Sequence, residues 1–228
     1  MNKALTIAAL VGFAGAASAQ LTITELYTGI SGEDGTVDWI EVTNTSDAAV
    51  DTGGFFYDDS GPNLADAVAL PSFVLNPGES AVILLEFAAS NDDDFANSTD
   101  EFLTIWGFNA GDINLGVTVN DGGGLGQGSD GAFIGVDNGG VLDIVDGLEY
   151  PDGLAGDFFT IEDTNDGIRQ SVLGENGAFE TSQFFNDNIG DPANGFQVSL
   201  VGSPGVIPAP ASAALLGLGG LAAIRRRR

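Results

Sequence analysis

The sequence contains no cysteine and no histidine in its 228 residues. Without cysteine, an oxidising compartment offers this chain no disulfide, so its stability must come from a packed core. Without histidine or cysteine, the chain also lacks the residues for a Ser-His-Asp or Cys-His catalytic site and for a zinc site of the usual type. These absences exclude most hydrolase mechanisms.

Basic residues are scarce as well. Between positions 20 and 205 the sequence holds all 33 acidic residues and a single cation, Arg169, which gives this segment a net charge of −32. Such a surface repels nucleic-acid backbones and anionic lipid, because it has no basic stripe that could release counterions. We therefore expect solubility in salt and a capacity to bind cations, and no nucleic-acid partner.

The first 19 residues have the pattern of a secretory signal peptide. Lys3 precedes an apolar stretch over residues 4–16, and Ala17 and Ala19 then supply the small-x-small pattern that a signal peptidase reads. We predict cleavage before Gln20 and export across the cytoplasmic membrane. A segment that is removed takes no part in the fold.

The last 23 residues contain a proline motif, an uncharged stretch and a terminal cluster of basic residues. The prolines are Pro208 and Pro210, and the basic residues are Arg225, Arg226, Arg227 and Arg228. Terminal arginines favour the cytoplasmic side of a membrane. The uncharged stretch 211–224 has only 14 residues, whereas a permanent span needs about 20. We therefore predict a short hydrophobic helix that contacts the membrane transiently and is then removed.

This order of parts resembles the PEP-CTERM sorting signal of bacteria that make extracellular polymer. The resemblance covers residues 206–228, with Ala209 in the place of the glutamate of the usual Pro-Glu-Pro motif. It implies that an exosortase-type processing enzyme, a membrane transpeptidase, is a partner of this segment. It also implies a final location at the cell surface or in the extracellular matrix of a bacterium.

Between the two ends, glycine, asparagine and aspartate divide the chain into short segments rich in Val, Ile, Phe, Leu and Thr, as is typical of strands joined by turns. Alternation or continuous apolar character predicts strands at residues 21–27, 37–42, 81–85, 101–107, 132–136, 141–145, 158–161 and 198–200. No long stretch has helical periodicity. Many short strands favour an all-β sandwich or barrel.

Six pieces of this middle segment carry a second resemblance, and they share an order along the chain. They are the strand Ile23–Leu26, the run Asp38–Asn44, the turns Val50–Phe55 and Leu75–Ser80, the hairpin Gly139–Asp143 with Glu149 and Tyr150, and the closing turn Gly202–Gly205. In this order they resemble a lamin-tail domain, an immunoglobulin-like β-sandwich found on nuclear lamins and on many secreted bacterial proteins. The resemblance implies one domain over residues 20–205. Residues 88–131 are longer and more acidic than such a sandwich requires, so we expect an insertion of loops and strands there.

Several residues of this resemblance have structural roles that elementary chemistry explains. Trp39 should cross the core with its ring N–H bonded to a partner. Asn44 can cap the end of a strand through its side chain, and Pro77 followed by Gly78 presets a tight turn, because proline fixes one φ and glycine permits a positive φ.

Calcium binding is the chemistry that suits the acidic loops best, because a hard cation takes six to eight oxygen ligands. The densest run holds Asp92, Asp93 and Asp94. A second run, with Asp163, Asn165 and Asp166, is similar to the start of an EF-hand loop, but it is one residue short and lacks the closing glutamate. A third combines Asp187, Asn188 and Asp191. The alternative for each run is a solvated acidic loop of a salt-adapted protein.

The sequence thus predicts an exported, non-enzymatic surface or matrix protein that binds extracellular polysaccharide or a surface protein and holds no cofactor apart from possible calcium. A calcium-dependent carbohydrate-binding module is one alternative. A glycoside hydrolase acting on exopolysaccharide is another, because a pair of carboxylates can cleave a glycosidic bond without histidine. Tyr27, Phe55, Phe56 and Tyr57 could stack on sugar rings, although the alternation along their strand favours core positions for part of this group.

Overall fold

The structure is a computed structural model and describes residues 21–29, 33–34, 37–61, 63–87, 98–120, 124–155, 158–164, 166–186 and 196–205. Within these residues the chain consists mostly of β-strands, with one α-helix, α1 (Ser98–Trp106), and one short 3-10 helix, η1 (Thr52–Gly54). The predicted all-β class is therefore confirmed. The predicted signal peptide and sorting segment lie outside the described residues. In the described ranges, no helix is both long and apolar enough to cross a bilayer.

The strands, in chain order, are β1 (Leu21–Tyr27), β2 (Glu33–Asp34), β3 (Trp39–Asn44), β4 (Val50–Asp51), β5 (Phe56–Asp58), β6 (Val68–Ala69), β7 (Val74–Leu75), β8 (Ser80–Phe87), β9 (Asn114–Asn120), β10 (Asp130–Asp137), β11 (Leu142–Tyr150), β12 (Ile161–Thr164), β13 (Gly167–Gln170), β14 (Phe179–Asn186) and β15 (Phe196–Gly202).

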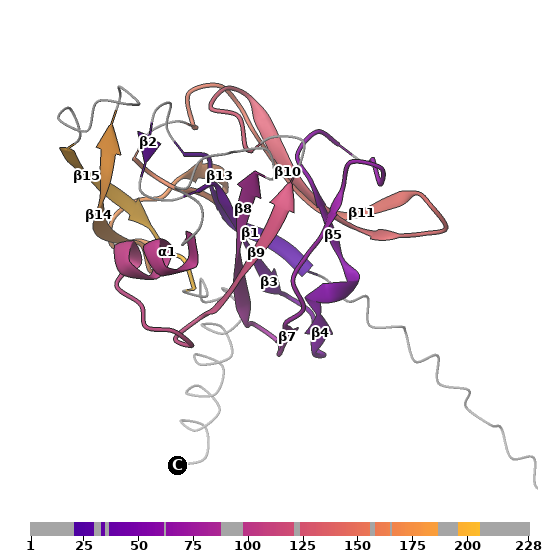
Figure 1. Cartoon of the computed structure of the whole chain (residues 1–228). Helices are drawn as coiled ribbons and strands as arrows, with labels where there is room; N and C mark the ends of the chain where they lie inside the picture. The colour runs from indigo at the N-terminus through magenta and orange to yellow at the C-terminus, as the bar shows by residue number, and fades with distance from the viewer. Residues whose placement is uncertain are drawn as a thin grey trace, which may run out of the picture.

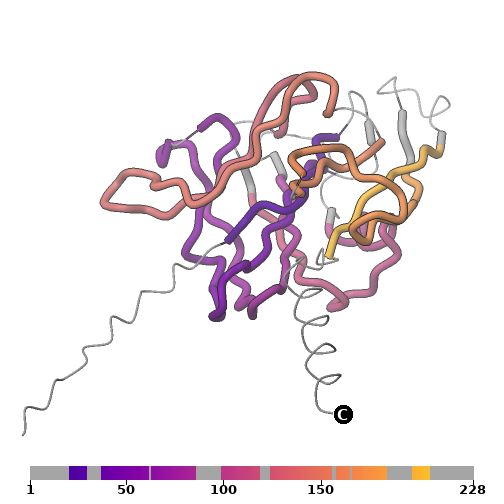
Figure 2. The backbone as a smooth tube through the Cα atoms, turned by 180° about the vertical axis from the view of Figure 1, so that it is seen from behind, coloured from indigo at the N-terminus to yellow at the C-terminus, as the bar shows by residue number. Residues whose placement is uncertain are grey.

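These strands form one large sheet and three smaller ones. The large sheet has six strands in the order β13-β12-β1-β3-β8-β9, and a four-stranded sheet has the order β11-β10-β5-β6. A three-stranded sheet, β15-β14-β2, and the pair β4-β7 complete the set. In Figure 1, β5 and the β10–β11 hairpin lie on one side of the central strands, and α1 lies with β14 and β15 on the other. The outer end of the β10–β11 hairpin extends away from the sheets in both views (Figure 1, Figure 2).

The main core lies between the six-stranded and the four-stranded sheet. Leu26, Ile40 and Ile83 belong to it from the large sheet, and Tyr57 and Ile134 belong to it from the smaller one. All five side chains are fully buried. Each such burial stabilises the fold by roughly 1.5–3 kcal/mol, so the packing of these two sheets is the principal source of stability.

A second core covers the opposite face of the large sheet. Trp39 of β3 packs there against Phe102 and Trp106 of α1, with ring centroids 5.7 and 6.1 Å apart and nearly perpendicular planes. Leu84 of β8 and Leu200 of β15 belong to the same cluster. The central strands are therefore buried on both faces, which is why all six residues of β3 are buried.

A β-bulge in β1 decides which of its side chains reach which core. The register between β1 and β3 shifts between Ile23 and Glu25, so Thr24 is the additional residue. As a result Ile23 and Leu26, although three residues apart, both belong to the main core. Thr24 and Glu25 both reach the opposite face, where Thr24 contacts Glu41 of β3.

Most of the predicted strands are confirmed. The prediction at residues 21–27 coincides with β1, and those at 81–85, 132–136 and 198–200 lie inside β8, β10 and β15. The strands predicted at 37–42 and 141–145 overlap β3 and β11, which begin one or two residues later. Of residues 158–161, only Ile161 belongs to a named strand, and Phe159 forms an isolated bridge with Val201.

The strand predicted at residues 101–107 is wrong, because this segment lies in α1. Phe102, Ile105 and Trp106 follow the three- and four-residue spacing of one helical face, and they pack in the second core. Asp100 and Glu101 occupy the first turn, where negative charge is stabilised by the helix dipole.

The described part of the expected insertion contains α1 and β9. β9 pairs with β8 in parallel, and α1 lies between these two strands in the sequence. The other strand pairs of this sheet are antiparallel. This segment of the chain thus adds one strand to the large sheet and supplies the helix that packs against Trp39.

Two of the three predicted structural roles are confirmed. Asn44 is fully buried and caps the end of β3, since its Nδ2 donates to the carbonyl oxygens of Ala48 and Leu75 at 2.7 and 2.9 Å. Gly78 has φ +82° in a turn that Glu79 N closes by donating to Asn76 O at 2.9 Å. The third role is half right.

Trp39 is buried in the second core as predicted, but the expected partner of its ring N–H is not found. Within the described residues, Nε1 of Trp39 has no hydrogen-bond partner. The ring is held instead by edge-to-face contacts with its aromatic neighbours.

The possible aromatic platform is also contradicted. Tyr27 and Tyr57 are fully buried, Phe55 is buried, and only Phe56 is partly exposed. Tyr27 belongs to the second core, whereas Phe55 and Tyr57 belong to the main core. These side chains cannot present a common surface to a sugar.

Candidate functional site: a buried row of glutamates

Three glutamates lie side by side on the face of the large sheet that carries the second core. Glu25 of β1 is directly opposite Glu41 of β3 on one side and Glu162 of β12 on the other. Directly opposite residues of neighbouring strands project from the same face. The exposed fractions of Glu25, Glu41 and Glu162 are only 1%, 1% and 2%. We call these three residues the glutamate row.

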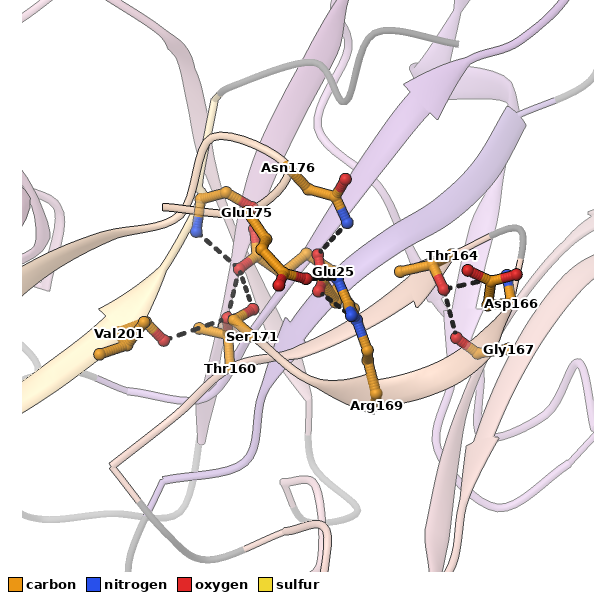
Figure 3. Close-up of polar contacts among 12 residues, drawn as sticks. Glu25, Thr160, Thr164, Asp166, Gly167, Arg169, Ser171, Glu175, Asn176 and Val201 are labelled. Atoms are coloured by element: carbon orange, nitrogen blue, oxygen red, sulfur yellow. Dashed lines mark hydrogen bonds and ion pairs between the residues drawn. The ribbon is translucent and has the colours of Figure 1, made fainter. Parts of the chain in front are cut away.

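Glu25, in the centre of the row, accepts hydrogen bonds from three sides. Its Oε1 accepts from Ser203 N at 2.8 Å, from the Thr160 hydroxyl and, more weakly, from Ser171 Oγ at 3.4 Å. Its Oε2 accepts from Ser203 Oγ at 3.0 Å. Figure 3 shows Glu25 between Thr160, Ser171 and the loop that carries Glu175. The carboxyl group therefore joins β1 to the segments on either side of the β12–β13 hairpin and to the turn after β15.

Glu41 connects the same turn to a chain of hydroxyl groups. Its Oε2 accepts from Gly205 N at 2.6 Å, and its Oε1 accepts from Thr24 Oγ1 at 2.6 Å. Thr24 Oγ1 lies 2.9 Å from Thr43 Oγ1, which lies 2.7 Å from Ser80 Oγ. Since a hydroxyl can donate or accept, this chain can hydrogen-bond Glu41 in its ionised or its protonated form.

Glu162 is the member of the row that has a cationic partner. Its Oε1 lies 2.8 Å from Arg169 Nε, and its Oε2 accepts from Asn176 Nδ2 at 3.0 Å. Arg169 also reaches Glu175, with Nη2 2.8 Å from Oε2. Asn176 has φ +48°, a left-handed conformation that asparagine tolerates better than most residues. The only basic residue of the described chain is thus committed to Glu162 and Glu175.

Burial raises the pKa of both remaining glutamates. Desolvation raises the pKa of Glu25 to about 7, against the lowering effect of its hydrogen bonds from Thr160 and Ser203. Desolvation, followed by the charge of Glu25, raises the pKa of Glu41 to about 8, against the hydrogen bonds from Thr24 and Gly205. Because two buried carboxylates cannot both ionise at low cost, the pair retains protons near neutral pH.

The geometry of the row suits internal bonding better than reaction with a substrate. The turn Ser203–Gly205 covers Glu25 and Glu41, and the acceptor oxygens of both residues are already bonded to protein donors. The hydrogen bonds join β1 and β3 to the turn that follows β15. Chemically, these carboxyl groups can hold the turn through hydrogen bonds and can bind and release protons.

The predicted calcium ligands are only partly described. Asp163 and Asp166 belong to the β12–β13 hairpin, in which Thr164 pairs with Gly167. The turn is closed by Thr164 Oγ1, which donates to Gly167 O at 2.7 Å and accepts from Asp166 N at 3.2 Å. Figure 3 shows Thr164, Asp166 and Gly167 together at this turn, apart from Glu25. The run that resembled an EF-hand loop is thus a tight hairpin turn.

The other predicted site residues lie outside the described residues. They are Asp92, Asp93, Asp94, Asn165, Asp187, Asn188 and Asp191 of the acidic runs, Ala17 and Ala19 of the signal cleavage site, and Pro208, Pro210, Arg225, Arg226, Arg227 and Arg228 of the sorting segment. In the part of the chain that the structure describes, no group of three or more acidic side chains is arranged to hold a metal ion.

Sequence reasoning missed the glutamate row, although a signal was present. Glu41 stands between Ile40 and Val42, and Glu25 directly precedes Leu26, each inside a predicted strand. Strict alternation would have placed Glu41 on the side of Trp39, a side chain already expected in the core. An acid on that side is unexpected unless it is bonded internally. For Glu25, the bulge at Thr24 hides the same signal.

The class that these observations define is an all-β protein with a central sheet buried on both faces and an internal carboxyl cluster. Comparison of the chain with family models, with curated proteins and with solved structures finds no match.

Proposed function

We propose that this chain is an exported, non-enzymatic protein of the cell surface or extracellular matrix, which binds or scaffolds through a sandwich of the lamin-tail, immunoglobulin-like type. Its partners in this proposal are an exosortase-type processing enzyme, which acts on the C-terminal segment, and an extracellular polysaccharide or surface protein. The C-terminal segment contacts the membrane transiently before it is removed.

The observation that carries the proposal is the position of the first strand and of the last turn of the domain relative to the two predicted processing sites. Leu21, two residues after the predicted cleavage site, is already fully buried in β1, an inner strand of the large sheet. Gly205, at the other end, donates to Glu41 immediately before the segment with the predicted sorting motif. The domain between the two predicted processing sites therefore begins with a strand of the large sheet and ends with a turn that is bonded to Glu41 of the same sheet, as expected of a domain that is released after processing.

The glutamate row supports a binding or scaffolding role over the glycosidase alternative. A glycosidase needs two carboxyl groups that flank a bound sugar. Glu25 and Glu41 are paired and have raised pKa values, but both lie beneath the closing turn with about 1% of their surface exposed. Calcium binding stays a prediction for the acidic run Asp92–Asp94.

Mass spectrometry of the mature protein from its native cell tests this proposal. We expect an N-terminus at Gln20 and a C-terminus that lacks the four arginines, with or without a group attached to the new end. An intact chain ending in Arg228 would overturn the sorting role.

Incubation of the protein with the polymer of the same cell tests the proposed binding role. Co-sedimentation without release of reducing sugar is expected, and release of reducing sugar would establish the glycosidase instead.

A further inference from the structure

The closing turn, Ser203–Gly205, is attached to the large sheet mainly through carboxyl groups. It lies past Gly202, the last residue of β15, so no strand ladder holds it. Ser203 is 2% exposed. Its backbone N–H is bonded to Glu25 Oε1 at 2.8 Å, and the N–H of Gly205 is bonded to Glu41 Oε2 at 2.6 Å. Two backbone donors of one turn thus meet two carboxyls on adjacent strands.

Close packing explains why these carboxyls can hold the turn so near to the sheet. Gly205 has φ +72°, and a Cβ there would lie 2.5 Å from Ile113 Cγ2. A Cβ at Gly202 would lie 2.6 Å from Thr160 Cγ2 and 2.8 Å from Trp106 Cη2. Only glycine fits at both positions, so the chain approaches these neighbours as closely as its backbone allows.

The charged groups around the pair do not neutralise it. From β12 the pair faces Glu162, which is acidic, and from β13 Arg169 approaches only as the partner of Glu162. The segment after β13 presents Glu175, which is bonded to the same arginine. The second core on the same face presents apolar and aromatic side chains, such as Trp106 and Leu84. No cation of the described residues other than Arg169 is available to the pair.

The pair of Glu25 and Glu41 therefore has a protonated state and a doubly ionised state, which need different surroundings. When it carries a proton, the hydroxyl chain from Thr24 to Ser80 can accept that proton's hydrogen bond, and the remaining oxygens still accept from the turn. When both carboxyls are ionised, two like charges lie close together in a site buried from solvent, next to Glu162, and the nearby Arg169 is bonded to Glu162 and Glu175. Movement of the turn can admit water, because the turn is bonded to the sheet through these two carboxyls rather than through a strand ladder.

We propose that Glu25 and Glu41 form a proton-dependent latch, which holds the closing turn against the large sheet while the pair carries a proton and loosens it when both carboxyls are ionised. The burial that raises the pKa of both residues places this change near neutral pH. Because residue 206 follows the turn directly, the latch sets whether the C-terminal segment leaves the domain from a fixed or a loosened point. The latch stands on the contacts of residues 25, 41 and 203–205, whether or not the segment is a sorting signal.

Nuclear magnetic resonance of the isotopically labelled full chain tests the latch directly. The carboxyl carbons of Glu25 and Glu41 and the amide protons of Ser203 and Gly205 are followed from about pH 5 to about pH 9. We expect the two carboxyls to titrate together above their ordinary range. Across this titration, the exchange protection of Ser203 and Gly205 should fall by about tenfold or more relative to Ile134 in the main core.

A matched pair of variants separates the latch from general loosening. Glu41→Gln removes the charge but keeps an oxygen for Gly205, so we expect the turn to stay protected at about pH 9. Glu149→Gln, on the exposed part of β11, should behave like the unmodified chain. Protection of the turn that is constant through the titration, or ordinary titration of both carboxyls near their unperturbed pKa, would overturn the proposal. These readouts on the unmodified chain decide the matter even if Glu41→Gln fails to fold.

Discussion

The two faces of the large sheet are built on different principles. The face toward the four-stranded sheet is apolar, with Leu26, Ile40 and Ile83 at its centre. The opposite face combines an aromatic cluster around Trp39 with the buried glutamate row. Apolar packing is insensitive to pH, whereas buried carboxyls bind and release protons. One sheet therefore supports a constant core on one side and a core whose stability depends on pH on the other.

The largest effect is expected from the aromatic part of the second core. Trp39→Ala removes the ring that packs against Phe102 and Trp106 and should lower the free energy of unfolding by about 3–5 kcal/mol. Ile83→Ala, on the apolar face, should cost about 2–5 kcal/mol. Urea unfolding followed by circular dichroism measures both. A loss below about 1 kcal/mol for Trp39→Ala would show that the second core contributes little to stability.

The dependence of stability on pH should separate the two faces. The folded-state pKa values of Glu25 and Glu41, about 7 and about 8, lie above the ordinary 4.5, so between these values the folded chain binds more protons than the unfolded chain. The stability contributed by the pair is therefore fully present below about pH 4.5 and is lost as the pH rises through 7 to 8. The slope reaches about 1.4 kcal/mol per pH unit for each such group.

Variants of the buried and of the exposed glutamates serve as controls for this pH profile. The double variant Glu25→Gln, Glu41→Gln should flatten the slope between about pH 5 and pH 8, whereas Glu149→Gln should leave it unchanged. Asp51, Glu79 and Asp112 act in the opposite direction at lower pH, because hydrogen bonds lower the pKa of each. The unmodified chain should therefore be most stable at mildly acidic pH. A profile that rises from pH 5 to pH 8 would contradict the assignment.

A smaller effect is expected at the turn that covers the glutamates. Gly205→Ala introduces a positive-φ alanine and a contact of 2.5 Å with Ile113, and should cost about 1–3 kcal/mol. Gly78→Ala has the same backbone problem, with φ +82°, but open space around the new Cβ, so about 1 kcal/mol is expected. Thermal unfolding of the two variants compares them.

The same substitution should also alter the titration of the pair. The hydrogen bond from Gly205 lowers the pKa of Glu41, so weakening that bond should raise this pKa further. Equal stability of the Gly205→Ala and Gly78→Ala variants, with no change in the pH profile, would mean that the turn is not held closely against the sheet.

Features of this fold that depend on neighbouring residues could be predicted from the sequence, and features that depend on contacts between distant segments could not. The strands at residues 21–27 and 81–85, the Pro77-Gly78 turn and the Asn44 cap were predicted because their signals are local. α1 was missed because Phe102, Ile105 and Trp106 in a short segment fit a strand as well as a helix. The choice is decided by the docking of the helix on Trp39, a contact distant in sequence.

The complete glutamate row was missed for a related reason. Glu25 reaches the same face as Glu41 only because of the bulge at Thr24, and it meets Glu162 only through the pairing of β1 with β12. Neither the register shift nor the order of strands can be predicted from a short stretch of sequence. The three glutamates of the row were also hard to single out among 33 acidic residues, because most of the others favour solubility.

The smallest effect is expected at the acidic hairpin turn, where sequence reasoning placed a metal ligand. Asp163 lies on β12 next to Glu162 but is exposed and unpaired with the row. Asp163→Asn should change the free energy of unfolding by less than about 0.5 kcal/mol. Because Thr164 Oγ1 closes the turn by hydrogen bonds with Gly167 and Asp166, the variant should also leave any shift of the melting temperature by calcium unchanged. Differential scanning calorimetry with and without calcium measures both, and a calcium response that disappears in Asp163→Asn would restore this turn as a metal site.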